Sequence, residues 1–145
     1  MPSANELAAD SLAYFPHDAN AANDIKCQRL LMRQGWSGYG RWWRVCELLA
    51  SNKGHVIPFG CDEDRLLLGK ALQFGTGGSF DDLMCDEEVT DFVNDLLDMG
   101  LLQMDENGCL ENPRMHKNAL SFGKKRAAGR KGGRPRKSAS PDQNA

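Results

Sequence analysis

The sequence predicts a mainly helical, α+β fold that closes with a small β-hairpin, and three observations lead to this class. Apolar residues recur at helical spacing in several segments. The dipeptide Asn107-Gly108, a strong hairpin signal, separates two extended runs in "LLQMDENGCLENP". About 100 residues lie between a polar start and a basic end, enough for one small domain with a single core.

Two helices are expected first. Asn23 is a suitable N-cap for "DIKCQRLLMRQ", and Gly35 suits the position after that helix ends. The next helix runs to Gly54, and we expect Trp42 and Trp43 to form a buried pair that anchors the core. Its apolar face follows the i, i+3, i+4, i+7 spacing of a buried helix through Tyr39, Trp42, Trp43, Cys46, Leu49 and Ala50.

The second half of the chain adds a strand, two helices and the hairpin. The Pro-terminated run "HVIPF" predicts a short edge strand, and "DEDRLLLGKALQF" predicts a third helix before the break "GTGGS". Asp86 can cap a fourth helix, "EEVTDFVNDLLDM", which Gly100 closes. This order is that of a winged helix-turn-helix, with three core helices and the hairpin as the wing.

The charge distribution divides the chain into a body and an arm. Residues 1–116 contain 9 Lys and Arg against 19 Asp and Glu, whereas residues 117–145 contain 9 against one, so the net charge of −2 is a near-cancellation. We expect a flexible N-terminus (1–13), a winged-helix domain (14–116) and a basic, disordered tail (117–145). A basic arm on an acidic body indicates a polyanion as the arm's partner, either nucleic acid or a membrane surface.

Several classes of function are disfavoured by the sequence. No apolar run approaches the roughly 18 residues of a membrane span, and the acidic start lacks a signal peptide's basic region, which predicts a cytoplasmic protein without a membrane partner. Five cysteines lie at least fifteen residues apart, a spacing that favours reduced, mostly buried thiols and no metal or other cofactor. His17, Asp18 and Asp24 could imitate a metal or acid–base site, but local packing is the preferred interpretation. No catalytic motif is present, so we expect no enzyme activity.

The arm holds the first set of candidate DNA contacts. Gly133-Arg134-Pro135 resembles the core of an AT-hook, which places Arg in the narrow A·T minor groove, although Gly132 stands where the first Arg of that motif belongs. Gly and Pro should keep the arm extended and non-helical. The alternative is a disordered tail that only aids solubility. The candidate contacts are Lys124, Lys125, Arg126, Arg130, Lys131, Arg134, Arg136 and Lys137.

The first two helices supply a second candidate patch, and the fourth helix supplies none. The patch would consist of Lys26, Arg29, Arg33, Arg41 and Arg44. Its alternative is ordinary surface charge that neutralises nearby Asp and Glu. The fourth helix has five acidic residues and no Lys or Arg, so phosphates would repel it. We interpret it as a structural helix with a solvated acidic face or a protein-binding face.

Ordered short motifs in the first half of the chain point to a family. They are Tyr14-Phe15-x-His17-Asp18, Asp24-x-Lys26 and Gly38-Tyr39-Gly40, followed later by "LLDMGLLQMDENGCLENPRM". This pattern resembles the N-terminal domain of phage and prophage replisome-organiser proteins, relatives of the DnaD-type primosome proteins of Gram-positive bacteria. The resemblance covers roughly residues 14–116 and implies a winged helix that works in DNA replication.

The leading hypothesis is therefore a phage-derived DNA-binding protein of replication initiation. A winged-helix scaffold would associate with other copies or with replication proteins, and its basic tail would attach it to nonspecific or A/T-rich DNA. The alternatives are a protein-interaction module without direct DNA binding and a phage transcriptional regulator.

Overall fold

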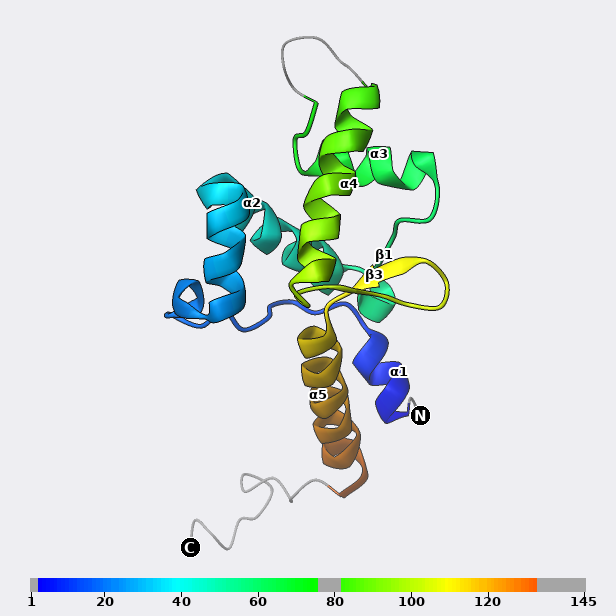
Figure 1. The fold of residues 1–145 in the computed structure, drawn as a ribbon. Helices are drawn as coiled ribbons and strands as arrows, with labels where there is room; N and C mark the ends of the chain where they lie inside the picture. The colour runs from blue at the N-terminus through cyan, green and yellow to red at the C-terminus, as the bar shows by residue number, and fades with distance from the viewer. Residues whose placement is uncertain (1–2, 76–81, 133–145) are drawn as a thin grey trace, which may run out of the picture.

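The computed structural model describes residues 3–75 and 82–132 and confirms the mainly helical α+β class, with one three-stranded antiparallel sheet (Figure 1). The finer assignment to the winged helices stays a prediction. Most of the "GTGGS" break and the whole AT-hook-like segment lie outside the described residues. In chain order the described elements are α1 (Ala4–Ala9), η1 (Ala21–Asn23), α2 (Ile25–Ser51), η2 (Lys53–His55), β1 (Val56–Pro58), α3 (Asp62–Ala71), α4 (Asp82–Asp98), β2 (Gln103–Met104), β3 (Cys109–Glu111) and α5 (Pro113–Gly132).

Helix α2 contains the break that was expected at Gly35. The backbone there has φ 69° and ψ −169°, so two helical segments meet at a kink in a conformation that glycine adopts without a steric penalty. The expected N-cap was wrong, because Asn23 belongs to the short turn η1. Asp24 caps the helix instead, and its carboxylate accepts the N–H of Lys26 at 3.0 Å.

Helix α4 begins at Asp82, earlier than the expected cap at Asp86. Cys85 is buried and extends the apolar face of Val89 and Phe92 by one turn, which accounts for the earlier start. Asp86 lies inside the helix, where its carboxylate accepts a hydrogen bond from Nε of Arg65 at 2.8 Å. This ion pair links α3 to α4.

The sheet has the order β1-β3-β2, so β1 is an edge strand, as its proline indicated. The hairpin between β2 and β3 is confirmed, with Met104 opposite Leu110. Of the two turn residues, only Gly108 has a positive φ, and the carboxylate of Asp105 accepts the N–H groups of Asn107 and Cys109 at 2.8 Å each. The connection is thus a three-residue loop with a left-handed glycine rather than a two-residue Asn-Gly turn.

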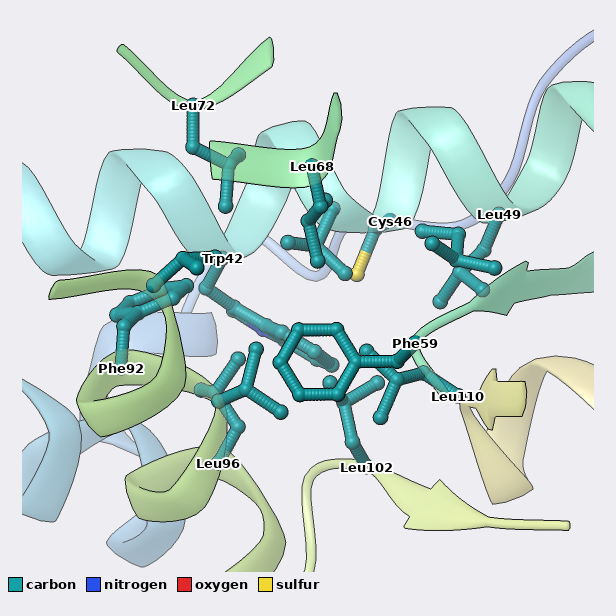
Figure 2. Close-up of a cluster of buried hydrophobic side chains, with 14 of the residues drawn as sticks. Trp42, Cys46, Leu49, Phe59, Leu68, Leu72, Phe92, Leu96, Leu102 and Leu110 are labelled. Carbon is teal, nitrogen blue, oxygen red and sulfur yellow. The ribbon is translucent and has the colours of Figure 1, made fainter. Parts of the chain in front are cut away.

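The core lies where α2, α3 and α4 meet the sheet and its hairpin (Figure 2). Trp42 is 4% exposed and lies close to Leu96 and Phe92 of α4, with Phe59 beside it. The expected buried pair is only half right, because Trp43 is intermediate in exposure. Trp43 faces the segment before α2, and the ring of His17 stacks on it with centroids 3.6 Å apart.

Within the residues expected to be a flexible N-terminus (1–13) and a disordered tail (117–145), the structure describes helix α1 and the part of helix α5 up to Gly132, and these two helices pack against each other. Ser3 and Glu6 form a capping box that starts α1, and the side chain of Asn112 accepts two N–H groups that start α5. Figure 1 shows α1 and α5 side by side, projecting from the rest of the molecule. Charge and glycine content alone suggested an extended arm, but α5 has a stripe of small and apolar residues that α1 covers. The stripe on α5 is Met115, Ala119 and Gly123, and Leu7 is buried from the α1 side.

Contacts at Asp10 hold the end of α1 in place. Its carbonyl oxygen lies 2.8 Å from Nε2 of His55, a fully buried ring, and its carboxylate lies 3.7 Å from Arg126 of α5. The pair of helices formed by α1 and α5, called here the terminal hairpin, is therefore joined to the body at η2.

Gly123 sets how closely the two helices of the terminal hairpin approach. A Cβ at this position would lie 2.5 Å from the carbonyl oxygen of Ala4 and 2.7 Å from the backbone N of Ala8, so the helices would have to separate. We predict that Gly123→Ala lowers the free energy of unfolding by about 1–3 kcal/mol, despite the better helix propensity of alanine. Urea unfolding followed by circular dichroism measures the change.

Gly129→Ala is the matched control, because a Cβ at Gly129 has no atom within 4 Å. That variant should be neutral or more stable by up to about 1 kcal/mol. Equal stabilisation by both substitutions would contradict the close contact.

Candidate nucleic-acid interface

The candidate patch on α2 is largely occupied by contacts within the fold. Arg41 donates to the carbonyl oxygens of Leu72 at 2.8 Å and Gln73 at 3.4 Å, and its guanidinium lies 4.0 Å from the centroid of the Phe74 ring. These carbonyls follow the end of α3, where a cation is favoured by the helix dipole. Arg41 therefore caps α3.

Two further cations of α2 bind α4 and the turn after it. Nζ of Lys26 donates to the carbonyl oxygen of Gly100 at 3.3 Å, and Arg33 lies 3.2 Å from Asp95 and 4.0 Å from Asp98. The side chain of Gln34 also donates to Asp95. The acidic helix is thus partly neutralised by α2, which agrees with the alternative interpretation of the patch as structural charge.

The last two members of the patch differ. Arg44 pairs with Glu47 at 2.9 Å on the surface of α2. Arg29 is exposed, and the described part of the chain provides no hydrogen bond or ion pair for it. A continuous, unpaired positive surface is therefore absent from α2 as far as the structure describes it.

Helix α5 presents a different surface. Lys117, Lys124 and Lys125 are exposed, on the side of the helix away from the stripe that α1 covers. Arg114 starts the same side and pairs with Asp18 at 3.1 Å. We call these four residues the basic face of α5. The remaining candidates are Arg126, which faces Asp10; Arg130 and Lys131, whose side chains are not described; and Arg134, Arg136 and Lys137, which lie outside the described residues.

A pocket of about 610 Å³ lies at the N-terminal end of this basic face. Its walls are the segment before α2, helix α2, the turn after α4 and the start of α5. Aromatic rings of Phe15, Trp42 and Trp43 line it together with apolar side chains. Its polar lining consists of Asp18, Asn20, Asn23, Asp24, Lys26, Asn112, Arg114 and Asn118.

One polar atom among the residues that line this pocket has no partner. Nε1 of Trp43 is buried and has no hydrogen-bond partner among the residues that the structure describes. A buried donor left unpaired costs about 1–3 kcal/mol, so an acceptor at this place would be favoured. No motif indicated the pocket, because its walls come from four separate segments of the chain. The helical spacing predicted Trp43 as a buried core residue and did not indicate that it lines a pocket.

The thiols and carboxylates do not form a metal centre in the described residues, where no group of three or more His, Cys, Asp or Glu is arranged to hold an ion. His17, Asp18 and Asp24 are committed elsewhere, to Trp43, Arg114 and the cap of α2. None of the five cysteines forms a disulfide in the described structure. Burial raises the pKa of Cys46 to about 12, although a hydrogen bond from Asn112 acts in the opposite direction.

Among the described helices, none combines the length and apolar character needed to cross a membrane. The fold and its charges define a small, mainly helical α+β domain that is extended by a basic C-terminal helix. Residues 14–111, well over half of the chain, match the model of a family described as Lin1244/Lin1753-like, N-terminal. The chain therefore belongs to the Lin1244/Lin1753-like family. No curated protein and no solved structure matches it. Helices α1 and α5 both lie outside the matched residues.

Arg41 and Arg29 allow a direct test of which α2 cations are structural. Arg41→Ala should lower the free energy of unfolding by about 1.5–3 kcal/mol, the range for hydrogen bonds to a charged group, because α3 loses its cap. Arg29→Ala should change it by less than about 0.5 kcal/mol, since the side chain is exposed. Denaturant titration measures both, and similar losses in the two variants would contradict the assignment.

The thiols should differ strongly in reactivity, because only the thiolate attacks a disulfide reagent. With Ellman's reagent at about pH 8, the exposed Cys61 should react first, while Cys46 and Cys85, both 2% exposed, should react only when the protein unfolds. Since burial holds the pKa of Cys46 far above this pH, that thiol stays protonated in the fold. A fast phase that persists when Cys61 and the half-buried Cys109 are both replaced by Ser would show that a buried thiol is accessible.

Proposed function

We propose that this chain is a DNA-binding protein of the phage or prophage replication-initiation type, attached to DNA without covalent chemistry through α5 and the arm that follows it. The observation that carries the proposal is the division of cations. Lysines of α5 are exposed and unpaired in the described structure, whereas most α2 cations have partners within the fold. The motifs near Tyr14 and Gly38 support a relationship to replisome organisers and DnaD-type proteins.

The geometry of α5 suits a polyanion. Lys117 and Lys124 are seven residues apart, about 10 Å along the helix axis, on one side. The sequence then continues into Arg130, Lys131, Arg134, Arg136 and Lys137. With seven or eight phosphate contacts, the logarithm of the affinity should fall with the logarithm of salt concentration at a slope of about −6 to −7. The Gly133-Arg134-Pro135 segment would add a preference for A/T-rich sites.

A second candidate function is a protein-interaction module, with other copies of the chain or replication proteins as partners. The observation that favours it is the acidic surface of α4, where Glu87 and Asp91 are exposed. A transcriptional regulator uses the same DNA chemistry, but it should bind one operator far more tightly than other sequences. Competition among unrelated duplexes separates a regulator from attachment through the arm.

Neutralising two lysines of α5 tests the proposal without cutting the helix. Lys124→Gln combined with Lys125→Gln should weaken duplex binding and make the salt slope less negative by about 2, one for each lost phosphate contact. Fluorescence anisotropy with a labelled duplex at several salt concentrations measures both quantities. Truncation after Gly132 leaves α5 complete. It should remove most of the affinity for duplex DNA that Lys124 and Lys125 do not supply.

The matched control is Arg29→Gln combined with Lys53→Gln, which removes the same charge from exposed positions outside α5. This control should bind duplex nearly as tightly as the unmodified chain. If both double variants lose affinity equally, net charge rather than the α5 surface governs binding. Unchanged affinity in the Lys124/Lys125 variant and in the truncated chain would refute the proposal.

A further inference from the structure

The pocket and the basic face of α5 are continuous. Arg114 belongs to both, since it lines the pocket and starts the side of α5 that bears Lys117 one turn later. A strand that follows the basic face toward the body therefore reaches the pocket. At about 610 Å³ the pocket is within the range of small-molecule sites and exceeds the volume of a single base.

The lining favours a flat ring with hydrogen-bonding edges. Phe15, Trp42 and Trp43 supply aromatic surface, and the carboxamides of Asn20, Asn23 and Asn118 can both donate and accept hydrogen bonds. The indole N–H of Trp43 is buried and has no hydrogen-bond partner among the described residues. An apolar peptide side chain would use none of these carboxamides, whereas the carbonyl oxygen or ring nitrogen of a nucleobase can pair with them.

Trp43 already accepts a heteroaromatic ring. His17 stacks on it at 3.6 Å with the planes 11° apart, although His17 itself is not among the pocket's lining residues. One cation at the pocket, Arg114, can meet a phosphate beside a bound base, whereas Lys26 donates to the carbonyl oxygen of Gly100. The carboxylate of Asp18 pairs with Arg114, and that of Asp24 caps α2, so a phosphate at Arg114 would exchange with Asp18.

We propose that the pocket beside Trp43 binds an unpaired nucleobase of single-stranded DNA, whose adjoining phosphates lie on the basic face of α5. This inference rests on the proposed DNA-binding function and adds a preference for unpaired strands. In a duplex the base edges are paired and the rings are stacked, so a base must leave the helix to enter such a site. Base–aromatic contacts of this kind contribute about 1–3 kcal/mol per base, equivalent to about a 5-fold to 150-fold change in affinity.

The first experiment observes Trp43 in the intact full chain. The three tryptophans give three indole N–H signals in a ¹⁵N-resolved spectrum, and a Trp→Phe variant assigns each signal. Addition of a dT 12-mer should shift the Trp43 signal, and a 12-mer with the same phosphates but abasic sugars should leave it in place. A shift that appears with N-acetyl-tryptophanamide and not with the dT 12-mer would identify a peptide site and overturn the proposal.

The second experiment compares two tryptophan variants. Trp43→Phe should reduce affinity for the dT 12-mer at least about 5-fold and leave affinity for the abasic 12-mer unchanged. Trp36→Phe is the matched control, because Trp36 is exposed and outside the pocket lining, and it should leave both affinities unchanged. The indole shift in the unmodified chain still tests the site if Trp43→Phe folds poorly.

The outcomes separate the two proposals. Salt-dependent duplex binding together with equal affinity for the dT and abasic 12-mers, and an unmoved Trp43 signal, would overturn the base pocket and leave DNA attachment standing. If the unmodified chain does not bind duplex DNA even at low salt, the proposed DNA attachment itself is refuted. A Trp43 shift with thymidine monophosphate in that case would still support a nucleobase site.

Discussion

The charges of helix α2 are the constraint on which the remaining structure depends. Arg41 closes the end of α3, Lys26 binds the carbonyl after α4, and Arg33 holds Asp95. Without Arg33, Asp95 and Asp98 of α4 would lose the cation of α2 that offsets their charge. Because these cations are fixed by the fold, α2 cannot also offer them to a polyanion without weakening the packing of α3 and α4. The lysines of α5 have no such commitment in the described structure, which is why the proposed DNA attachment is assigned to α5.

Local sequence signals predicted the elements of the body well. Gly35 broke α2, Pro58 ended an edge strand, and the apolar stripe of α4 was buried as its spacing indicated. These features depend on backbone preferences and on periodicity within one segment, which a single sequence displays. The errors of detail were at helix starts, where Asp24 and Asn23 are equally good caps by type and only the turn η1 decides between them.

The terminal hairpin and the pocket could not be predicted in the same way. A signal for α5 did exist, since Asn112-Pro113 is a good helix start and Met115, Ala119 and Gly123 are spaced by four. The abundance of Lys, Arg and Gly obscured it, because composition described the segment as an arm. The stripe is stable only when α1, more than 100 residues away in the sequence, covers it. The pocket likewise depends on the meeting of distant segments. The helical spacing of Trp43 does not show whether the residue lines a pocket or is buried in the hydrophobic core.

The position of α1 has a practical consequence for work on the isolated family domain. Residues 14–111 exclude both helices of the terminal hairpin, so a fragment with these limits removes them together. A fragment that starts at residue 14 but keeps α5 would instead expose the small-residue face of α5 around Ala119 and Gly123, and one that stops at residue 116 would expose Leu7 of α1. Exposed apolar surfaces of this kind associate with one another, and the resulting aggregation could be mistaken for native oligomerisation.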